Sequence, residues 1–209
     1  MHALAKKTDY SLIGDSIEPG SRVLDLGCGD GELLFSLKTL KNIWGRGVDI
    51  DENNVIHCIE KGLSVCQRNI DEGLQDYKDQ SFDYVVLNQT IQVVHKPHIV
   101  LDEMLRVGRK VIVGFPNFGY IQLPLYLFFR GRMPKSKQLP YEWYNTPNIH
   151  LLTIKDFREF CKNRSITIVD EIFIRNDKVL PRTLAIRLFE NIFIEAAIFI
   201  ISRESSQKS

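Results

Sequence analysis

The sequence predicts an α/β fold in which a mostly parallel, doubly wound sheet carries helices on both faces. Short apolar runs typical of buried strands alternate with segments whose apolar residues recur at helical spacing. A glycine-rich stretch separates the first such strand from the first such helix, at the place where doubly wound sheets bind ligands. The 209 residues, of which 44% are hydrophobic and 25% charged, suffice for one core of ordinary size. We therefore expect a single domain spanning residues 1–209.

The first half of the chain alternates regularly between the two kinds of element. Residues 22–26 predict a strand, residues 27–31 a glycine loop, and residues 32–40 a helix with leucines on one face. The next strand ends in acidic residues at 45–51, and the helix that follows it stops at Gly62. Further strands are predicted at 64–66, 82–87 and 110–115, with a helix at 99–107.

The composition changes after Pro116, where glycine, proline, aromatic and basic residues dominate. We predict an insertion or lid at about 117–150, built from a helix and a long ordered loop. Its apolar residues, followed by Arg130 and Arg132, are typical either of a protein interface or of a lid over a ligand pocket. After this region Thr153 is positioned to cap a helix, and strands are predicted at 166–174 and 196–202.

Charge and cysteine content exclude several classes of protein. Twenty-seven basic against 26 acidic residues leave a net charge of +1, which disfavours a nucleic-acid or membrane partner. Four dispersed cysteines without a C-x-x-C pair argue against a zinc site, and we expect no metal. No apolar stretch has the length of a signal peptide or membrane span, so we expect a cytoplasmic protein.

The glycine loop carries the most informative spacing in the chain. Its pattern is Asp25-x-Gly27-x-Gly29-x-Gly31, whereas a dinucleotide fingerprint requires a glycine at position 32, which is Glu32. An acid before the loop would oppose a pyrophosphate but favours a ligand with a positive charge. A second acid, Asp49, ends the second strand and can accept hydrogen bonds from a ribose diol. A nucleoside joined to an amino acid satisfies both acids, and a dehydrogenase is disfavoured.

These residues resemble the class I S-adenosylmethionine-dependent methyltransferases. The resemblance implies a three-layer, Rossmann-like fold with a mostly parallel seven-stranded sheet, and S-adenosylmethionine or S-adenosylhomocysteine as the ligand. The adenine amino group would bind either Asn69, where the family usually has Asp, or Asp71. Asn88 would lie beside the methyl-sulfonium group, and Cys28 is expected to be a small buried residue of the loop. The cofactor-binding residues that the resemblance implies are Asp25, Gly27, Cys28, Gly29, Gly31, Asp49, Ile50, Asn69, Ile70 and Asn88.

A narrower resemblance rests on four longer strings: Gln89–Gln92, Phe115–Gly119, Gly131–Pro134 and Leu139–His150. These look like the MetW family of methionine-biosynthesis proteins, over residues 12–202. The departures are Asn69, and Arg68 where the family usually has Gly. The resemblance implies that the chain acts beside homoserine O-acyltransferase as a partner or regulator. The chain has no G-x-S-x-G nucleophile motif, so we do not expect it to be the acyltransferase itself.

The alternative is a methyltransferase acting on a small molecule. Methyl transfer requires mainly a nucleophile held in line with the sulfonium methyl, so the sequence assigns no catalytic residue. The polar candidates on loops are His95, His98, His150, Tyr141 and Tyr144. The methyl acceptor and the oligomeric state are not predicted by these patterns.

Overall fold

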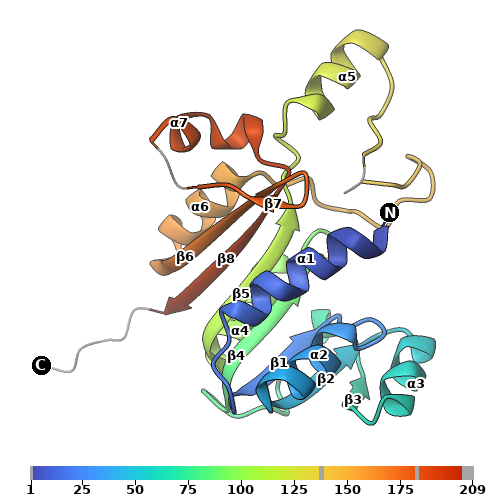
Figure 1. Cartoon of the computed structure of the whole chain (residues 1–209), viewed down its shortest axis with the longest axis vertical. Helices are drawn as coiled ribbons and strands as arrows, with labels where there is room; N and C mark the ends of the chain where they lie inside the picture. The colour runs from blue at the N-terminus through green and yellow to red at the C-terminus, as the bar shows by residue number, and fades with distance from the viewer. Residues whose placement is uncertain (1, 137–138, 182–183, 204–209) are drawn as a thin grey trace, which may run out of the picture.

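The computed structural model describes residues 2–136, 139–181 and 184–203. Within them one mixed sheet has the strand order β3-β2-β1-β4-β5-β8-β6-β7 (Figure 1). The strands are β1 (Arg22–Leu26), β2 (Trp44–Asp49), β3 (Ser64–Gln67), β4 (Phe82–Asn88), β5 (Gly108–Pro116), β6 (Ile166–Arg175), β7 (Lys178–Val179) and β8 (Ala196–Arg203). The helices are α1 (His2–Asp15), α2 (Glu32–Lys41), α3 (Glu52–Glu60), the 3-10 turn η1 (Ile70–Glu72), α4 (Pro97–Val107), α5 (Gln122–Arg130), α6 (Ile154–Asn163) and α7 (Leu184–Phe193).

Strands β1 to β5 are parallel, and β8 is antiparallel to both β5 and β6. The central strands are almost wholly apolar because both of their faces are covered. On β5, for example, Val111, Ile112 and Val113 are all fully buried. This arrangement confirms the predicted α/β fold with helices on both sides of a mostly parallel sheet.

Alternate residues of the strands pack into two separate cores. Val23 and Val86 belong to the core covered by α1 and α2, whereas Leu24 and Val85 belong to the core covered by α4 and α6. Three of these helices connect one strand to the next, α2 from β1 to β2, α4 from β4 to β5 and α6 from β5 to β6, whereas α1 precedes the sheet. Because both faces of the sheet are buried, the strands appear in the sequence as short, continuous apolar runs.

Three features of the fold differ from the prediction, and one of them is helix α7, which the sequence pattern did not predict. The sheet gains a short strand, β7, because Asn176 and Asp177 have φ angles of 50° and 58° and form a tight turn back onto β6. Helix α1 was not predicted, since its sequence shows no continuous apolar stripe. It is nevertheless fixed to the sheet through Ile13, which is fully buried.

Helix α5 projects away from the rest of the molecule (Figure 1). Its base is fixed by a small apolar cluster of Tyr120, Leu123 and Leu139. Only Leu123 of the helix is buried. Among the described residues, no helix is long and apolar enough to cross a membrane.

The predicted helix after Thr153 is present as α6. The Thr153 side chain accepts from the backbone N–H of Asp156, and the Asp156 carboxylate accepts from the backbone N–H of Thr153. This capping box satisfies donors that a helix start otherwise leaves unpaired.

Candidate functional site

The glycine loop connects β1 to α2 at the carboxyl end of the parallel strands. The N–H groups of Gly27 and Cys28 donate to the carbonyl oxygen of Val48 at 2.8 and 3.1 Å, which fastens the loop to β2. Gly27 has a φ of 69°, and a Cβ atom there would lie 2.7 Å from the Thr90 side chain. Gly29 also has a positive φ, of 55°, but faces open space. The loop therefore brings bare backbone to the edge of a cavity.

That cavity has a volume of about 390 Å³, within the range of small-molecule sites. Its walls come from the ends of β1, β2 and β3 and from the segment after β4. It is lined by Gly27, Gly29, Asp49, Ile50, Asn54, Arg68, Asn69, Ile70, Asp71, Thr90, Val93, Val94 and His95.

Asp49 is held in one orientation at the end of β2. Its Oδ2 accepts from the N–H of Gly29 at 2.7 Å, and its Oδ1 accepts from the N–H of Asp51 at 3.0 Å and from Asn54 Nδ2 at 3.1 Å. The side chain is buried, yet it still lines the cavity. A carboxylate offers about four acceptor positions, so Asp49 retains capacity for a ligand hydroxyl.

Asp25, on β1, is a second buried carboxylate, only 3% exposed. Burial, and secondarily the negative charge of Asp49, raise its pKa to about 7. Among the described residues, no cation lies within ion-pair distance of Asp25, whereas the buried Glu190 pairs with Arg158. Asp25 does not line the cavity, so it would act on a ligand through its charge.

Asn69 and Asp71 both line the cavity, and each already has a partner within the protein. Asn69 Oδ1 accepts from the N–H of Asp71 at 3.0 Å and so caps η1. The carboxylate of Asp71 accepts from the N–H groups of His95 and Lys96 at 3.1 and 2.9 Å. Asp71 therefore fixes the segment that closes one side of the cavity.

Six of the ten predicted cofactor residues line this cavity: Gly27, Gly29, Asp49, Ile50, Asn69 and Ile70. Asp25, Cys28, Gly31 and Asn88 do not line it. Cys28 Sγ is 3.9 Å from Cys58 Sγ, and burial raises its pKa well above the ordinary range. A Cβ on Gly31 would meet Leu63 at 2.5 Å, so this glycine allows close packing of α2.

Asn88 points across the sheet toward β5. A Cβ on Gly114 would lie only 2.1 Å from Asn88 Oδ1, which shows that the side chain occupies the space above that glycine. Asn88 Oδ1 is buried and has no hydrogen-bond partner among the described residues.

Sequence reasoning did not select Asn54, Thr90, Val93 or Val94. Asn54 lies on the first turn of α3, where a polar residue carries no specific signal. Thr90, Val93 and Val94 lie in an aperiodic segment that only the fold brings beside the glycine loop.

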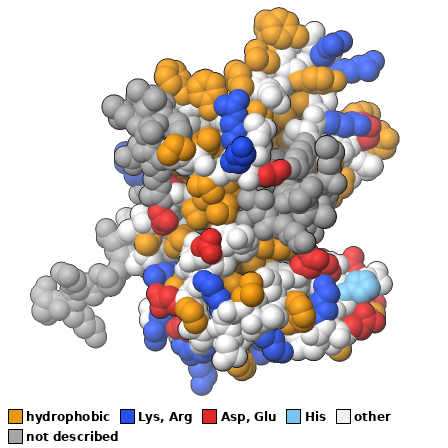
Figure 2. Space-filling view, viewed as in Figure 1, with side chains coloured by type: hydrophobic (Ala, Val, Ile, Leu, Met, Phe, Trp, Pro, Cys, Tyr) orange, Lys and Arg blue, Asp and Glu red, His pale blue; other side chains and the backbone are white. Residues whose placement is uncertain are grey.

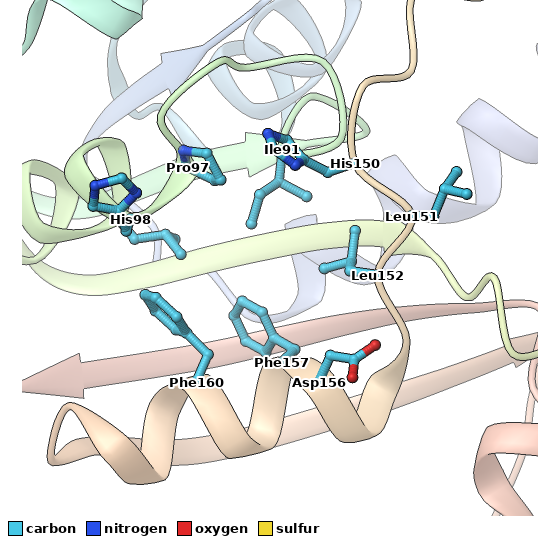
Figure 3. A pocket seen from close by; sticks show the side chains of 10 residues that line it. Ile91, Pro97, His98, His150, Leu151, Leu152, Asp156, Phe157 and Phe160 are labelled. Carbon is cyan, nitrogen blue, oxygen red and sulfur yellow. The ribbon is translucent and has the colours of Figure 1, made fainter.

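The five polar candidates for methyl transfer are not brought together. His95 lines the cavity at the glycine loop. His98 and His150 instead line a second cavity of about 390 Å³ between α4 and α6, with Phe157 and Phe160 in its wall (Figure 3). Tyr141 and Tyr144 are exposed near α5.

Comparison with known proteins gives a consistent picture over most of the chain. A family model described as methionine biosynthesis protein MetW matches residues 7–201. A Rhodopirellula baltica protein named bifunctional methionine biosynthesis protein MetXA/MetW is 37% identical over 174 residues. The match covers 79% of this chain but 28% of that protein, so the chain spans less than a third of this relative. An uncharacterized protein of Methanocaldococcus jannaschii is 25% identical, over 77% of this chain and 73% of that protein.

Solved structures of methyltransferases share the fold. A SAM-dependent methyltransferase from Archaeoglobus fulgidus superposes with a TM-score of 0.64 at 14% identity, covering 93% of this chain and 94% of that one. Magnesium protoporphyrin IX methyltransferase from Synechocystis, solved with bound SAH, also gives 0.64, at 16% identity, over 97% and 83% of the two chains. The chain thus has the Rossmann-like fold of the class I methyltransferases, as predicted.

Proposed function

Because the chain belongs to the MetW family of methionine-biosynthesis proteins, we propose that it binds S-adenosylmethionine or S-adenosylhomocysteine at the glycine loop and acts with homoserine O-acyltransferase. The observation that carries the proposal is the cavity in which Gly29 and the fixed carboxylate of Asp49 lie side by side. Bare backbone next to an oriented carboxylate is suited to a nucleoside.

The residues that line the cavity fit the nucleoside part of this ligand. Asp49 would accept from a ribose hydroxyl at its remaining acceptor position, and the apolar side chains of Ile50 and Ile70 would contact the adenine ring. Asn69 or Asp71 would accept from the adenine amino group. The bound molecule carries an amino acid and, in the methylated form, a sulfonium, which supplies an electrophilic methyl group.

The charge of the site favours a cation. Asp25 and Asp49 lie close enough for the second to raise the pKa of the first. A ligand with an ammonium or sulfonium group would stabilise the ionised form of Asp25, so binding should be tighter above pH 7 than below it.

The partnership with the acyltransferase is supported by the Rhodopirellula baltica relative, whose name joins MetXA and MetW in one protein. Fusion of two proteins in one chain is expected where they act in the same step. The present chain has no nucleophile motif of its own, so it would contribute as a subunit or regulator of the acylating enzyme.

A second candidate function is methyl transfer to a small molecule. It is favoured by the methyltransferase fold and by His95, the one ring among the five polar candidates that lines the cavity. Incubation with methyl-labelled S-adenosylmethionine and a metabolite extract would produce a labelled compound if this function is correct.

The main proposal is tested by homoserine-dependent release of coenzyme A from the acyltransferase, with and without this protein and S-adenosylmethionine. We expect the protein to change the rate and the ligand to modulate that change. The Asp49→Ala variant should alter the rate without responding to the ligand. An unchanged rate together with the absence of a complex would rule out the partnership, whereas absence of heat in calorimetry at millimolar ligand would rule out the cofactor.

A further inference from the structure

Helix α5 and the chain that follows it form the most exposed apolar surface of the described structure. We define the α5 arm as residues 121–136 and 139–151. Phe128, Phe129, Trp143 and Tyr144 are 80%, 75%, 74% and 69% exposed. Figure 2 shows hydrophobic side chains gathered around this projecting part of the molecule, beside Lys and Arg side chains. Large apolar patches of this kind mark interaction sites.

We propose that the α5 arm is the surface on which homoserine O-acyltransferase docks; this assignment rests on the partnership proposed above. Exposed aromatic side chains next to arginines have the composition of the energetic centre of a protein interface. Phe128 and Phe129 pack edge to face against each other, as do Trp143 and Tyr144, so each pair presents a broad aromatic contact.

The arm also has a concave part that can receive side chains of a partner. A cleft of about 650 Å³ lies between the end of α5 and the chain at 141–143. Its charged and aromatic lining residues are Tyr126, Arg132, Lys135, Tyr141, Glu142 and Trp143. Lys135 pairs with Glu142, which leaves Arg132 as the cation of the cleft without an ion pair among the described residues, so the cleft suits an apolar or acidic side chain.

The charges of the arm indicate the chemistry of the partner surface. Lys135 pairs with Glu142, but no carboxylate of the described residues lies within ion-pair distance of Arg130 or Arg132. We therefore expect apolar residues flanked by carboxylates on the acyltransferase. A second copy of this chain fits less well, because a two-fold contact would bring the same unpaired arginines toward each other.

A membrane surface also fits less well than a protein. A helix that lies on a bilayer has one polar and one apolar face. On α5 the five consecutive residues Leu125, Tyr126, Leu127, Phe128 and Phe129 are all exposed and point around the whole helix. Contacts on every side of a helix require a concave protein surface.

The far end of the arm is joined to the cofactor cavity. The N–H groups of Ile149 and His150 both donate to the carbonyl oxygen of Gln92, at 2.8 and 3.0 Å. Gln92 is buried, and its neighbours Thr90 and Val93 line the cavity. A ligand that shifts the 90–95 segment would therefore move this end of the arm, and cofactor binding would change the affinity for the acyltransferase.

The test measures the dissociation constant of the complex between this protein and its acyltransferase. The arm variant is Phe128→Ser/Phe129→Ser. The matched control is Leu40→Ser/Trp44→Ser, which changes two apolar residues of similar exposure, 78% and 62%, on α2 and β2. We expect at least tenfold weaker binding for the arm variant and less than twofold change for the control. Arg130→Glu/Arg132→Glu should weaken the complex most at low salt.

The outcomes separate the surface from the partnership. If the wild type binds and the arm variant binds equally well, the assignment of the surface is wrong while the partnership stands. If the wild type forms no complex, the partnership itself fails. Loss of binding to anionic phosphatidylserine vesicles, or of self-association, with partner affinity unchanged would also overturn the assignment. S-adenosylmethionine should change the affinity of the wild-type complex, and the acyltransferase should change the cofactor affinity by the same factor.

Discussion

At the glycine loop, two carboxylates are buried inside the body of the protein, whereas on the α5 arm large apolar side chains are exposed to water. Asp25 is 3% exposed and Phe128 is 80% exposed, the reverse of what each side chain favours. Among the described residues, no cation lies within ion-pair distance of Asp25, and the Phe128 ring remains exposed although it packs against Phe129. The contrast indicates two different incomplete sites: one suited to a small cation, the other to a protein.

Changing Asp25 to Asn should have the largest effect on stability. The folded state raises the pKa of Asp25 from 3.8 to about 7, so the folded protein binds this proton more tightly than the unfolded chain. Stability is therefore lost as pH rises from about 4 to about 7 and stays reduced above that range. Asp25→Asn should raise the free energy of unfolding at pH 8 by up to about 2–4 kcal/mol.

Urea unfolding at pH 8 and at pH 4.5 measures this effect. The gain should shrink as the pH falls toward 4, because Asp25 is then protonated in the folded wild type and approaches half protonation in the unfolded chain. The same variant should bind S-adenosylmethionine more weakly at pH 8. A variant that is less stable than the wild type at pH 8 would contradict the account of a costly buried charge.

Removing the Asp49 carboxylate should have the largest effect on ligand affinity. Asp49→Ala removes the acceptor of the Gly29 N–H as well as the contacts proposed for the ribose. We expect S-adenosylmethionine to bind with a free energy about 1.5–3 kcal/mol less favourable, or roughly 10–100-fold more weakly. Asp51→Ala is the control, since this exposed residue caps α3 without lining the cavity. Equal ligand affinities in calorimetry would remove Asp49 from the site.

A smaller change distinguishes the two residues proposed for the adenine. Asn69→Asp restores the charged acceptor usual in methyltransferases, and should tighten binding by about 1 kcal/mol if this side chain accepts from the amino group. Asp71→Asn should weaken binding if Asp71 is the acceptor instead. Calorimetric titration of both variants with S-adenosylhomocysteine decides between them. If both variants bind the ligand as tightly as the wild type, neither Asn69 nor Asp71 contacts the adenine amino group.

The arm should contribute least to stability and to the cofactor. Phe128→Ser/Phe129→Ser removes two exposed side chains, and surface changes of this kind are usually within about 0.5 kcal/mol. We expect the melting temperature and the affinity for S-adenosylmethionine of the isolated variant to match the wild type. A large fall in melting temperature would show that the arm packs against the body, and would weaken the contrast between the two regions.

Most of the sheet was predictable because buried parallel strands leave short apolar runs such as 82–87 between polar turns. Helix α1 was not, since the residues that fix it, Ile13 and Ile17, are few and lie near its end. Strand β7 depends on the conformation of Asn176 and Asp177, which the apolar pattern does not reveal.

The site was predictable as far as spacing along strands determines it. Gly29 lies in the loop directly after β1 and Asp49 ends β2, the adjacent parallel strand, so they had to meet at the same edge of the sheet. Spacing does not determine where a side chain points. The contact of Cys28 with Cys58, and the position of Asn88 over Gly114, could therefore not be predicted. The aperiodic segment with Thr90 and Val93 reaches the cavity only through tertiary folding.

The position of β8 has a consequence for how the chain acquires its structure during synthesis. This strand is the last described element in sequence, yet it lies between β5 and β6 and pairs with both. When β6 leaves the ribosome, the edge that pairs with β8 has no partner strand until some twenty further residues have been translated. The half that contains the glycine loop can fold first, because its contacts are close in sequence. Until β8 is made, apolar residues of β6 such as Phe173 stay uncovered, and a chaperone would be most useful at that stage.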